Sequence, residues 1–178
     1  MTAAPRIEGR GVVLRGFEEG DVAWVFEACQ DEELQRWTLV PSPYTLEDAR
    51  DFVLRVAPAS WREEGFGGLA VVDPHDGRGL ASVGVAAMDR SRGSGVAELG
   101  YWVAASARKR GVGSEALALL TAWTQEVLRL ARCELHIEAE NAASIATALR
   151  AGYHHEEPGS AWLPRRGEGT GVLLVAER

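Results

Sequence analysis

The first third of the chain carries one strand-like apolar run and two helical patterns. Residues 12–14 form a short apolar run that ends at Gly16. Apolar positions 22, 25, 26 and 29 then share one face of a helix, with Asp21 as the candidate N-cap. Thr45 followed three residues later by Asp48 indicates a second helix start, because this spacing is similar to a capping box. We therefore predict two amphipathic helices in this part.

The middle of the chain changes to the pattern of strands. Apolar runs occupy residues 69–72, 80–88 and 96–103. Turn-rich segments at 74–79 and 89–95 separate them. Short turns between consecutive strands predict an antiparallel meander.

The last third returns to helical spacing and then alternates. Apolar residues from Ala116 to Leu130 keep helical spacing, which predicts the longest helix. A strand is expected at 133–139, then a short helix at about 142–150 that Gly152 ends, then a final strand at 171–176. This order predicts a mixed α/β sheet with helices on both faces, formed as a single domain by all 178 residues.

Charge and composition exclude several classes of protein. The formal net charge of −7 opposes binding to nucleic acid, which relies on lysine and arginine displacing counterions from phosphates. No apolar run reaches the roughly 18 residues of a membrane span, and the first ten residues lack the apolar stretch of a secretory signal. Cys29 and Cys133 are too few to staple a domain of this size. We therefore expect a cytoplasmic protein with reduced thiols and no membrane partner.

The junction between the meander and the long helix carries the most informative residues. Arg108, Lys109 and Arg110 precede Gly111 and Gly113 there. A helix N-terminus exposes about four unpaired backbone N–H groups and a partial positive charge, so it stabilises an anion such as a pyrophosphate. Glycines let the backbone approach such a ligand, although they also serve plain turns. The order Arg-x-x-Gly-x-Gly is neither a Walker loop nor the dinucleotide fingerprint.

This order resembles the pyrophosphate loop of the GNAT superfamily of acyl-CoA N-acyltransferases, which reads Q/R-x-x-G-x-G/A. The resemblance extends along most of the chain through the segments LRGFEEGD, PYTLEDARDFV, AELGYWV and AENAASIATALRAGY. Together they are similar to the RimJ/RimL-like branch, which acetylates α-amino groups of ribosomal proteins and other amines. The resemblance implies acetyl-CoA as co-substrate and a mostly antiparallel, twisted sheet that is splayed at the cofactor strand.

The resemblance also assigns cofactor-binding residues. Backbone groups of Trp102 and Val103 would pair with the pantetheine arm, whereas the Trp102 side chain is interpreted as an ordinary half-buried strand residue. Asn141 lies near the pantetheine arm in this family, and its residue type also suits a helix cap. The amides expected to hold the pyrophosphate belong to Arg108, Lys109, Arg110, Gly111, Val112, Gly113 and Ser114.

Acyl transfer to an amine needs a base, because an alkyl amine is mostly protonated at neutral pH. Glu98 is the candidate, since several GNAT enzymes place a glutamate on the strand before the loop. A solvated or salt-bridged strand residue is the alternative. Ser144 or Tyr153 could supply a hydroxyl to the oxyanion or leaving thiolate, and a backbone N–H near Val103 would assist. Ser144 also suits helix capping, and Tyr153 also suits core packing.

Two further features concern the substrate side. Trp37 follows the first predicted helix, in a region that lines the amine side of the cleft in the resembled family, so we expect it to contact the acceptor. Four polar residues that alternate along one strand mimic a metal site, although a solvated or substrate-facing edge explains them better. They are Glu134, His136, Glu138 and Glu140. We expect no metal.

These features together predict an N-acetyltransferase in which a primary amine attacks acetyl-CoA directly in a ternary complex. The acceptor would be a protein N-terminus or a small-molecule amine, and the sequence does not choose between them. It also leaves open a homodimer and an acyl group larger than acetyl. A non-catalytic acyl-CoA sensor or scaffold is the alternative function. An RNA- or ribosome-binding protein without chemistry is a third, which the net charge disfavours.

Overall fold

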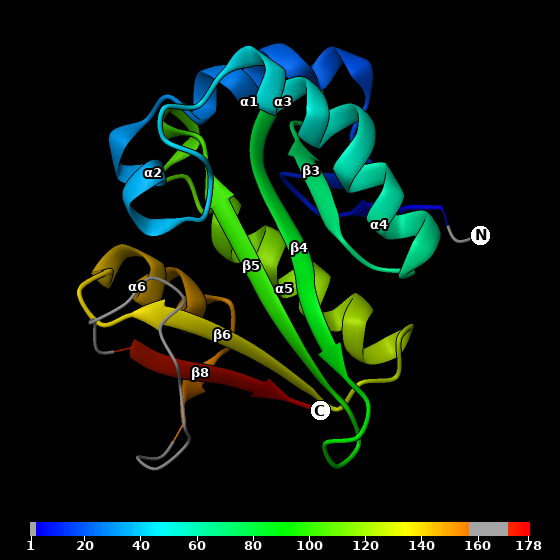
Figure 1. Cartoon of the computed structure of the whole chain (residues 1–178). Coiled ribbons are helices and arrows are strands. Elements are labelled where there is room, and N and C mark those ends of the chain that lie inside the picture. The colour runs from blue at the N-terminus through cyan, green and yellow to red at the C-terminus, as the bar shows by residue number, and fades with distance from the viewer. Residues whose placement is uncertain (1–2, 157–170) are drawn as a thin grey trace.

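The computed structural model describes residues 3–156 and 171–178. Over these residues, eight strands form one sheet in the order β1-β2-β3-β4-β5-β6-β8-β7 (Figure 1). The predicted antiparallel meander is confirmed in β3, β4 and β5. The strand bounds are β1 Ile7–Glu8, β2 Val13–Arg15, β3 Gly68–Val72, β4 Gly79–Asp89, β5 Val96–Val103, β6 Arg132–Glu138, β7 His154–His155 and β8 Gly171–Glu177.

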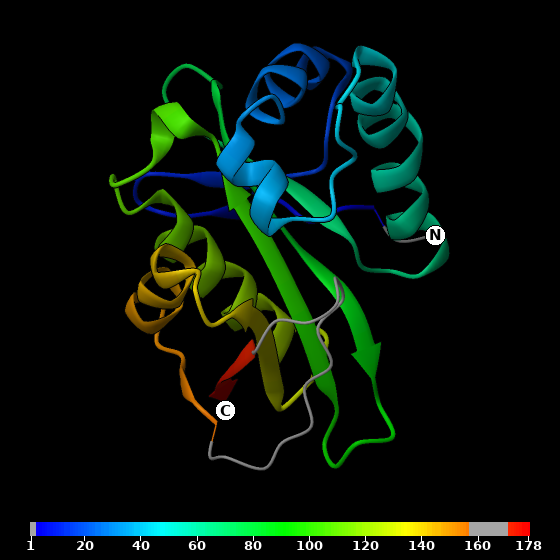
Figure 2. The same cartoon turned by 60° about the vertical axis from the view of Figure 1, so that its left-hand side comes forward.

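Helices cover both faces of the sheet, as predicted from the sequence (Figures 1 and 2). α1 and α3 gather on one face, whereas α5 passes behind β4 and β5 in the view of Figure 1. No helix in the described ranges is long and apolar enough to cross a membrane. The bounds are η1 Glu19–Asp21, α1 Val22–Ala28, α2 Glu32–Trp37, α3 Leu46–Asp51, η2 Phe52–Val56, α4 Ala57–Glu63, η3 Ala105–Ala107, α5 Val112–Glu126 and α6 Ala142–Arg150.

The feature of the fold that positions the site is the separation of β5 from β6. These parallel neighbours pair only at three positions, which end with Glu98 opposite Glu134. β5 then continues to Val103 and β6 to Glu138, so the two strands diverge (Figure 1). The other edge of β5 stays paired with β4 as far as Val103. The predicted splay at the cofactor strand is therefore confirmed, and the edge of β5 beyond Glu98 faces the gap.

Asp21 is the N-cap residue of α1, as predicted, but its side chain makes no capping hydrogen bond to that helix. Its buried carboxylate accepts hydrogen bonds from Arg15 at 2.7 and 2.9 Å, from Trp24 Nε1 at 2.8 Å and from the Glu18 amide at 2.8 Å. Burial disfavours the charged form, but the hydrogen bonds from Arg15, Trp24 and Glu18 outweigh it and lower the pKa of Asp21. An ion pair between a strand and a helix start is not visible in a local pattern.

The helix predicted at Thr45 has its capping box, and the helical stretch continues as far as Glu63. The Asp48 amide donates to Thr45 Oγ1 at 3.1 Å, and the Thr45 amide donates to Asp48 Oδ2 at 2.8 Å. α3 passes without a break through the wide π-type turn η2 into α4, where Ala57 N–H bonds the carbonyl of Phe52. Pro58 follows and has no N–H with which to continue an ordinary α-helical ladder.

The predicted long helix is confirmed as α5, but it is shorter at its C-terminus. It ends at Glu126 and not at Leu130. Arg129 takes a φ of 59°, a left-handed conformation that an α-helix does not continue through. Leu130 is nevertheless buried, 1% exposed, which explains its apolar character outside the helix.

Candidate active site

The N-terminus of α5 is open to a ligand. Gly111 is the N-cap and has a φ of 80°, which glycine adopts without steric cost. Among the described residues, none hydrogen-bonds to the amides of Val112, Gly113 and Ser114. The Glu115 carboxylate does not fold back onto them, because it accepts from the amides of the β1–β2 turn instead. The first turn of α5 therefore keeps its donors for an anion.

Gly113 brings three elements close together at this helix start. A Cβ at this position would lie 3.0 Å from Val103 Cγ2 on β5 and 3.1 Å from Thr147 Cγ2 on α6. Both distances are tighter than ordinary van der Waals contact. Close packing of α5 against β5 and α6 is enough to explain a glycine at this position, whether or not its backbone also contacts a ligand.

The Arg108 side chain contacts protein carboxylates. Its Nη2 lies 2.5 Å from Asp31 Oδ1, its Nη1 lies 3.2 Å from Glu33 Oε2, and its Nε donates to the Val103 carbonyl at 3.2 Å. Asp31 is also the N-cap of α2, accepting from the Leu34 amide, and the hydrogen bond from Arg108 lowers its pKa. The Arg108 side chain therefore ties the loop to α2.

A cleft of about 1160 Å³ joins this helix start to the gap between β5 and β6. Its walls come from α2, β4, β5, β6, α5 and α6. Arg110 and Tyr153 are the predicted site residues that do not line it, in the described part of the chain. The predicted site residues that do are Trp37, Glu98, Trp102, Val103, Arg108, Lys109, Gly111, Val112, Gly113, Ser114, Asn141 and Ser144.

Alternation along β5 divides the cleft into two sides. Tyr101 and Val103 face α5 and α6, since Tyr101 Oη bonds Ser144 and Val103 approaches Gly113. Glu98, Gly100 and Trp102 must then face the opposite side. The Trp102 ring confirms this, because it lies 5.6 Å from the ring of Trp24 on α1. The α5 loop and the Glu98 carboxylate therefore reach the splay from opposite faces of the sheet.

Ser144 combines the capping role with a position in the cleft. Asn141 is the N-cap of α6, and its Oδ1 accepts from the Ser144 amide at 3.1 Å. The Ser144 hydroxyl lies 2.7 Å from Tyr101 Oη, which also bonds the Ser144 carbonyl at 3.0 Å. Burial raises the pKa of Tyr101, although hydrogen bonds from Ser144 and Thr147 oppose this. Two neutral hydroxyls are thus joined beside the splay.

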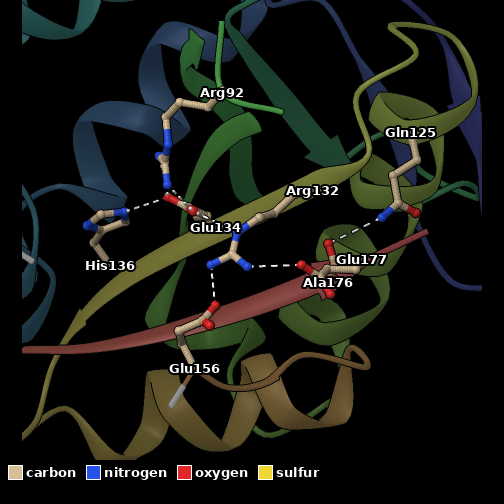
Figure 3. Close-up of polar contacts among 8 residues, drawn as sticks. All are labelled: Arg92, Gln125, Arg132, Glu134, His136, Glu156, Ala176 and Glu177. Atoms are coloured by element: carbon tan, nitrogen blue, oxygen red, sulfur yellow. Dashed lines mark hydrogen bonds and ion pairs between the residues drawn. The ribbon is translucent and has the colours of Figure 1, made fainter. Parts of the chain in front are cut away.

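A charge network anchors the base of the splay on the Glu98 side (Figure 3). Glu134, 3% exposed, accepts from Arg132 Nε at 2.8 Å and from Arg92 Nη2 at 3.1 Å, and its Oε2 lies 3.4 Å from His136 Nε2. Burial disfavours the charge of Glu134, but the two arginines outweigh it and lower its pKa. Arg132 also pairs with Glu177 at 3.0 Å and with Glu156.

This network corrects the interpretation of the alternating polar residues as a solvated or substrate-facing edge for Glu134 alone. Glu134 is buried and paired with arginines, whereas His136 and Glu138 line the cleft. Glu140 lies beyond the end of β6 and approaches Arg36 at 3.7 Å. Within the described residues, no group of three or more histidine, cysteine or acidic side chains is placed to hold a metal ion.

The comparison with protein families decides the class. The model of the acetyltransferase (GNAT) domain matches residues 12–154, which include the splay, the loop and α6. The chain belongs to the GNAT acetyltransferase family. The segment AELGYWV and the Arg-x-x-Gly-x-Gly loop of this chain both fall inside the matched range. No curated protein matches this acetyltransferase significantly.

Solved structures share the fold of this acetyltransferase at low identity. A Vibrio cholerae protein named as a ribosomal-protein-serine acetyltransferase is 22% identical, covers 100% of both chains and has a TM-score of 0.82. The microcin C7 self-immunity acetyltransferase MccE, solved with acetyl-CoA and AMP, is 16% identical over 96% of this chain and 94% of its own, with a TM-score of 0.79. RimL, the ribosomal L7/L12 α-N-protein acetyltransferase, was solved with coenzyme A. It is 19% identical over 97% of this chain and 98% of its own, with a TM-score of 0.77.

Tyr153 of the acetyltransferase lies in the core. It is 3% exposed, and its hydroxyl lies 2.7 Å from Thr121 Oγ1, which in turn donates to the Leu117 carbonyl. Burial raises the pKa of Tyr153. Its position agrees with the core-packing alternative, and we do not include it in the catalytic group proposed below.

Sequence reasoning missed Tyr101 and Gly100 of the cleft, and it left two positions open for His136. Tyr101 bonds a residue 43 positions away, and no local pattern shows such a contact. The pattern of alternating polar residues indicates either a solvated or a substrate-facing position for His136, and the fold places it in the cleft beside Glu134. Gly100 interrupts a strand pattern, a signal of close backbone approach that could have marked it.

Proposed function

We propose that this acetyltransferase moves an acetyl group from acetyl-CoA to a primary amine by direct attack in a ternary complex. The observation that carries the proposal is that the uncapped first turn of α5 and the diverging edge of β5 open into one cleft. A carrier that has a diphosphate and a thioester arm fits both features at once. The solved complexes of MccE and RimL support the same assignment of acetyl-CoA.

Each part of the carrier has proposed partners. The backbone of residues 108–114 holds the diphosphate, with Lys109 exposed beside it. The β5 edge at Trp102 and Val103 pairs with the pantetheine arm, and Asn141 lies across the gap at the start of α6. Arg110 is exposed and contributes its backbone. The whole chain is proposed to act as one domain.

The proposed chemistry uses the two sides of β5. Glu98 accepts a proton from the amine, and the freed nitrogen attacks the thioester carbonyl carbon. The oxyanion that forms is stabilised by a backbone N–H near Val103. The carbon–sulfur bond then breaks and the nitrogen gives its second proton to water. The thiolate leaves with a hydrogen bond from the Ser144 hydroxyl, which its bond to Tyr101 positions, and takes its proton from water. The neutral state that burial favours for Tyr101 suits a hydroxyl that donates.

The acceptor is proposed only as a primary amine that reaches the Glu98 side. Trp37 of α2 lines that side of the cleft and is our candidate for contacting it. RimL is named for ribosomal L7/L12 and MccE for immunity to microcin C7, so a protein N-terminus and a small-molecule amine both remain candidates. A homodimer stays open. The buried, free thiols of Cys29 and Cys133 fit a proposed location in the cytoplasm.

The test is amine-dependent release of thiol from acetyl-CoA. We expect a panel of peptides with free N-termini, polyamines and amino acids to contain acceptors that raise release at least about tenfold above the acceptor-free rate. Peptides with blocked N-termini are the control, because they have no nucleophilic α-amine. Tight binding of acetyl-CoA without release by any amine would indicate the sensor or scaffold instead.

A further inference from the structure

Gly100 leaves open space in the middle of the central strand. Apart from its two chain neighbours, no residue has an atom within 4 Å of a Cβ built at this position, which lies on the wall of the cleft. Gly100 does not take a left-handed φ, so its backbone would tolerate any L-residue. Neither backbone conformation nor packing therefore explains a glycine here.

Walls surround this space on several sides. Glu98 and Trp102 precede and follow Gly100 on the same face of β5. Gly84 is its cross-strand partner on β4, and a Cβ there would meet the Gly67 carbonyl oxygen at 2.7 Å, so the chain before β3 closes that side. His136 lies two residues beyond the last β5–β6 pair, at the same level as Gly100. Gly100 is exposed, so this part of the cleft has bare backbone as its floor.

This part of the cleft lies on the acceptor side of the sheet. The α5 loop and Ser144 approach β5 from the face of Tyr101 and Val103, and Gly100 points to the other face. A carrier anchored at the α5 loop reaches the splay from the face of Tyr101 and Val103. The reacting nitrogen must lie near Glu98, so the first atoms attached to that nitrogen lie over Gly100.

We propose that Gly100 determines acceptor specificity, and that the acceptor is an amine whose nitrogen-bearing carbon carries a substituent. This substituent packs on the bare backbone of Gly100, between Trp102 and Glu98. The class includes the α-amino groups of amino-acid residues other than glycine. It does not require an unbranched alkyl amine as the acceptor. The proposal rests on the acetyltransferase function proposed above.

The test compares Gly100→Ala with the wild type on matched acceptors. Two peptides that differ only in a glycine or a valine at the free N-terminus present the same amine without and with a substituent. We expect Gly100→Ala to lower kcat/KM for the valyl peptide at least tenfold more than for the glycyl peptide, and Gly100→Val to widen the gap. The dissociation constant of CoA, measured by calorimetry, should stay within twofold.

Gly20→Ala is the matched control, because a Cβ there also meets nothing within 4 Å, and Gly20 does not line the cleft. An equal loss of kcat/KM for both peptides would overturn the specificity role. A large loss of CoA affinity in Gly100→Ala would also overturn it, since this part of the cleft would then belong to the carrier. Absence of turnover by the wild type with every amine is a different result, which rejects the proposed function itself.

Discussion

Glu98→Gln is expected to lower kcat at least about 100-fold at neutral pH, because general-base catalysis contributes roughly 10²- to 10⁴-fold. Glutamine keeps the shape of the half-buried side chain but cannot accept the amine proton. The rate of the variant should recover towards alkaline pH, since the fraction of unprotonated amine rises there without help from the protein. The measurement is thiol release at saturating acceptor over a range of pH, together with CoA affinity, which should not change.

Glu63→Gln is the control, because Glu63 is exposed on α4 and does not line the cleft. Unchanged turnover in Glu98→Gln would remove Glu98 as the base. His136→Gln then becomes the decisive second variant, since His136 lines the same cleft and faces the carboxylate of Glu134. A loss of kcat in His136→Gln alone would assign the proton transfer to that imidazole.

Ser114→Asp should weaken CoA binding strongly while leaving the helix intact. Ser114 is the third residue of α5, where an acidic side chain is favourable to the helix dipole. A carboxylate a few ångströms from a bound diphosphate costs about 2–4 kcal/mol near a protein surface, which corresponds to roughly 30- to 1000-fold in affinity. Calorimetric titration with CoA at low salt measures this loss, and added salt should reduce it.

Ser114→Ala separates the effect of charge from loss of the hydroxyl, which donates to the Gly111 carbonyl at 3.0 Å. We expect this variant to bind CoA within a few-fold of the wild type. Gly113 is less suitable, because a Cβ there would lie 3.0 Å from Val103 Cγ2 and 3.1 Å from Thr147 Cγ2, so a loss of affinity could come from altered packing of α5. Equal CoA affinity in Ser114→Asp and the wild type would place the diphosphate elsewhere.

The parts of the fold that follow from local chemistry were predictable. The Thr45–Asp48 capping box, the meander of β3 to β5 and the end of α6 at Gly152 each depend on neighbouring residues, and each is found. The wide turn η2 before Pro58 was not predicted, although the proline was visible. The apolar pattern also extended α5 to Leu130, because a residue buried after a helix has the same composition as one inside it.

The segments predicted to form the site do line one cleft, but the contacts that set the roles of their side chains were not predictable. The loop from Arg108 to Ser114 has a recognisable order of residues, but the role of the Arg108 side chain depends on Asp31, 77 positions away. The Tyr101–Ser144 hydrogen bond and the Arg92–Glu134 hydrogen bond also join residues far apart, at 43 and 42 positions. Such contacts form only when the sheet is assembled, so residue order alone could not distinguish a ligand-binding side chain from one that fastens the loop.

Amide chemical shifts of the ¹⁵N-labelled chain during titration with CoA test the central claim most directly. Pantetheine, which has the thiol arm but no diphosphate, is the matched ligand. CoA should shift the amides of residues 111–114 and those of β5 near Val103, whereas pantetheine should shift only the β5 group. If CoA binds and leaves the amides at the start of α5 unchanged, the diphosphate is not held there, and the account is wrong.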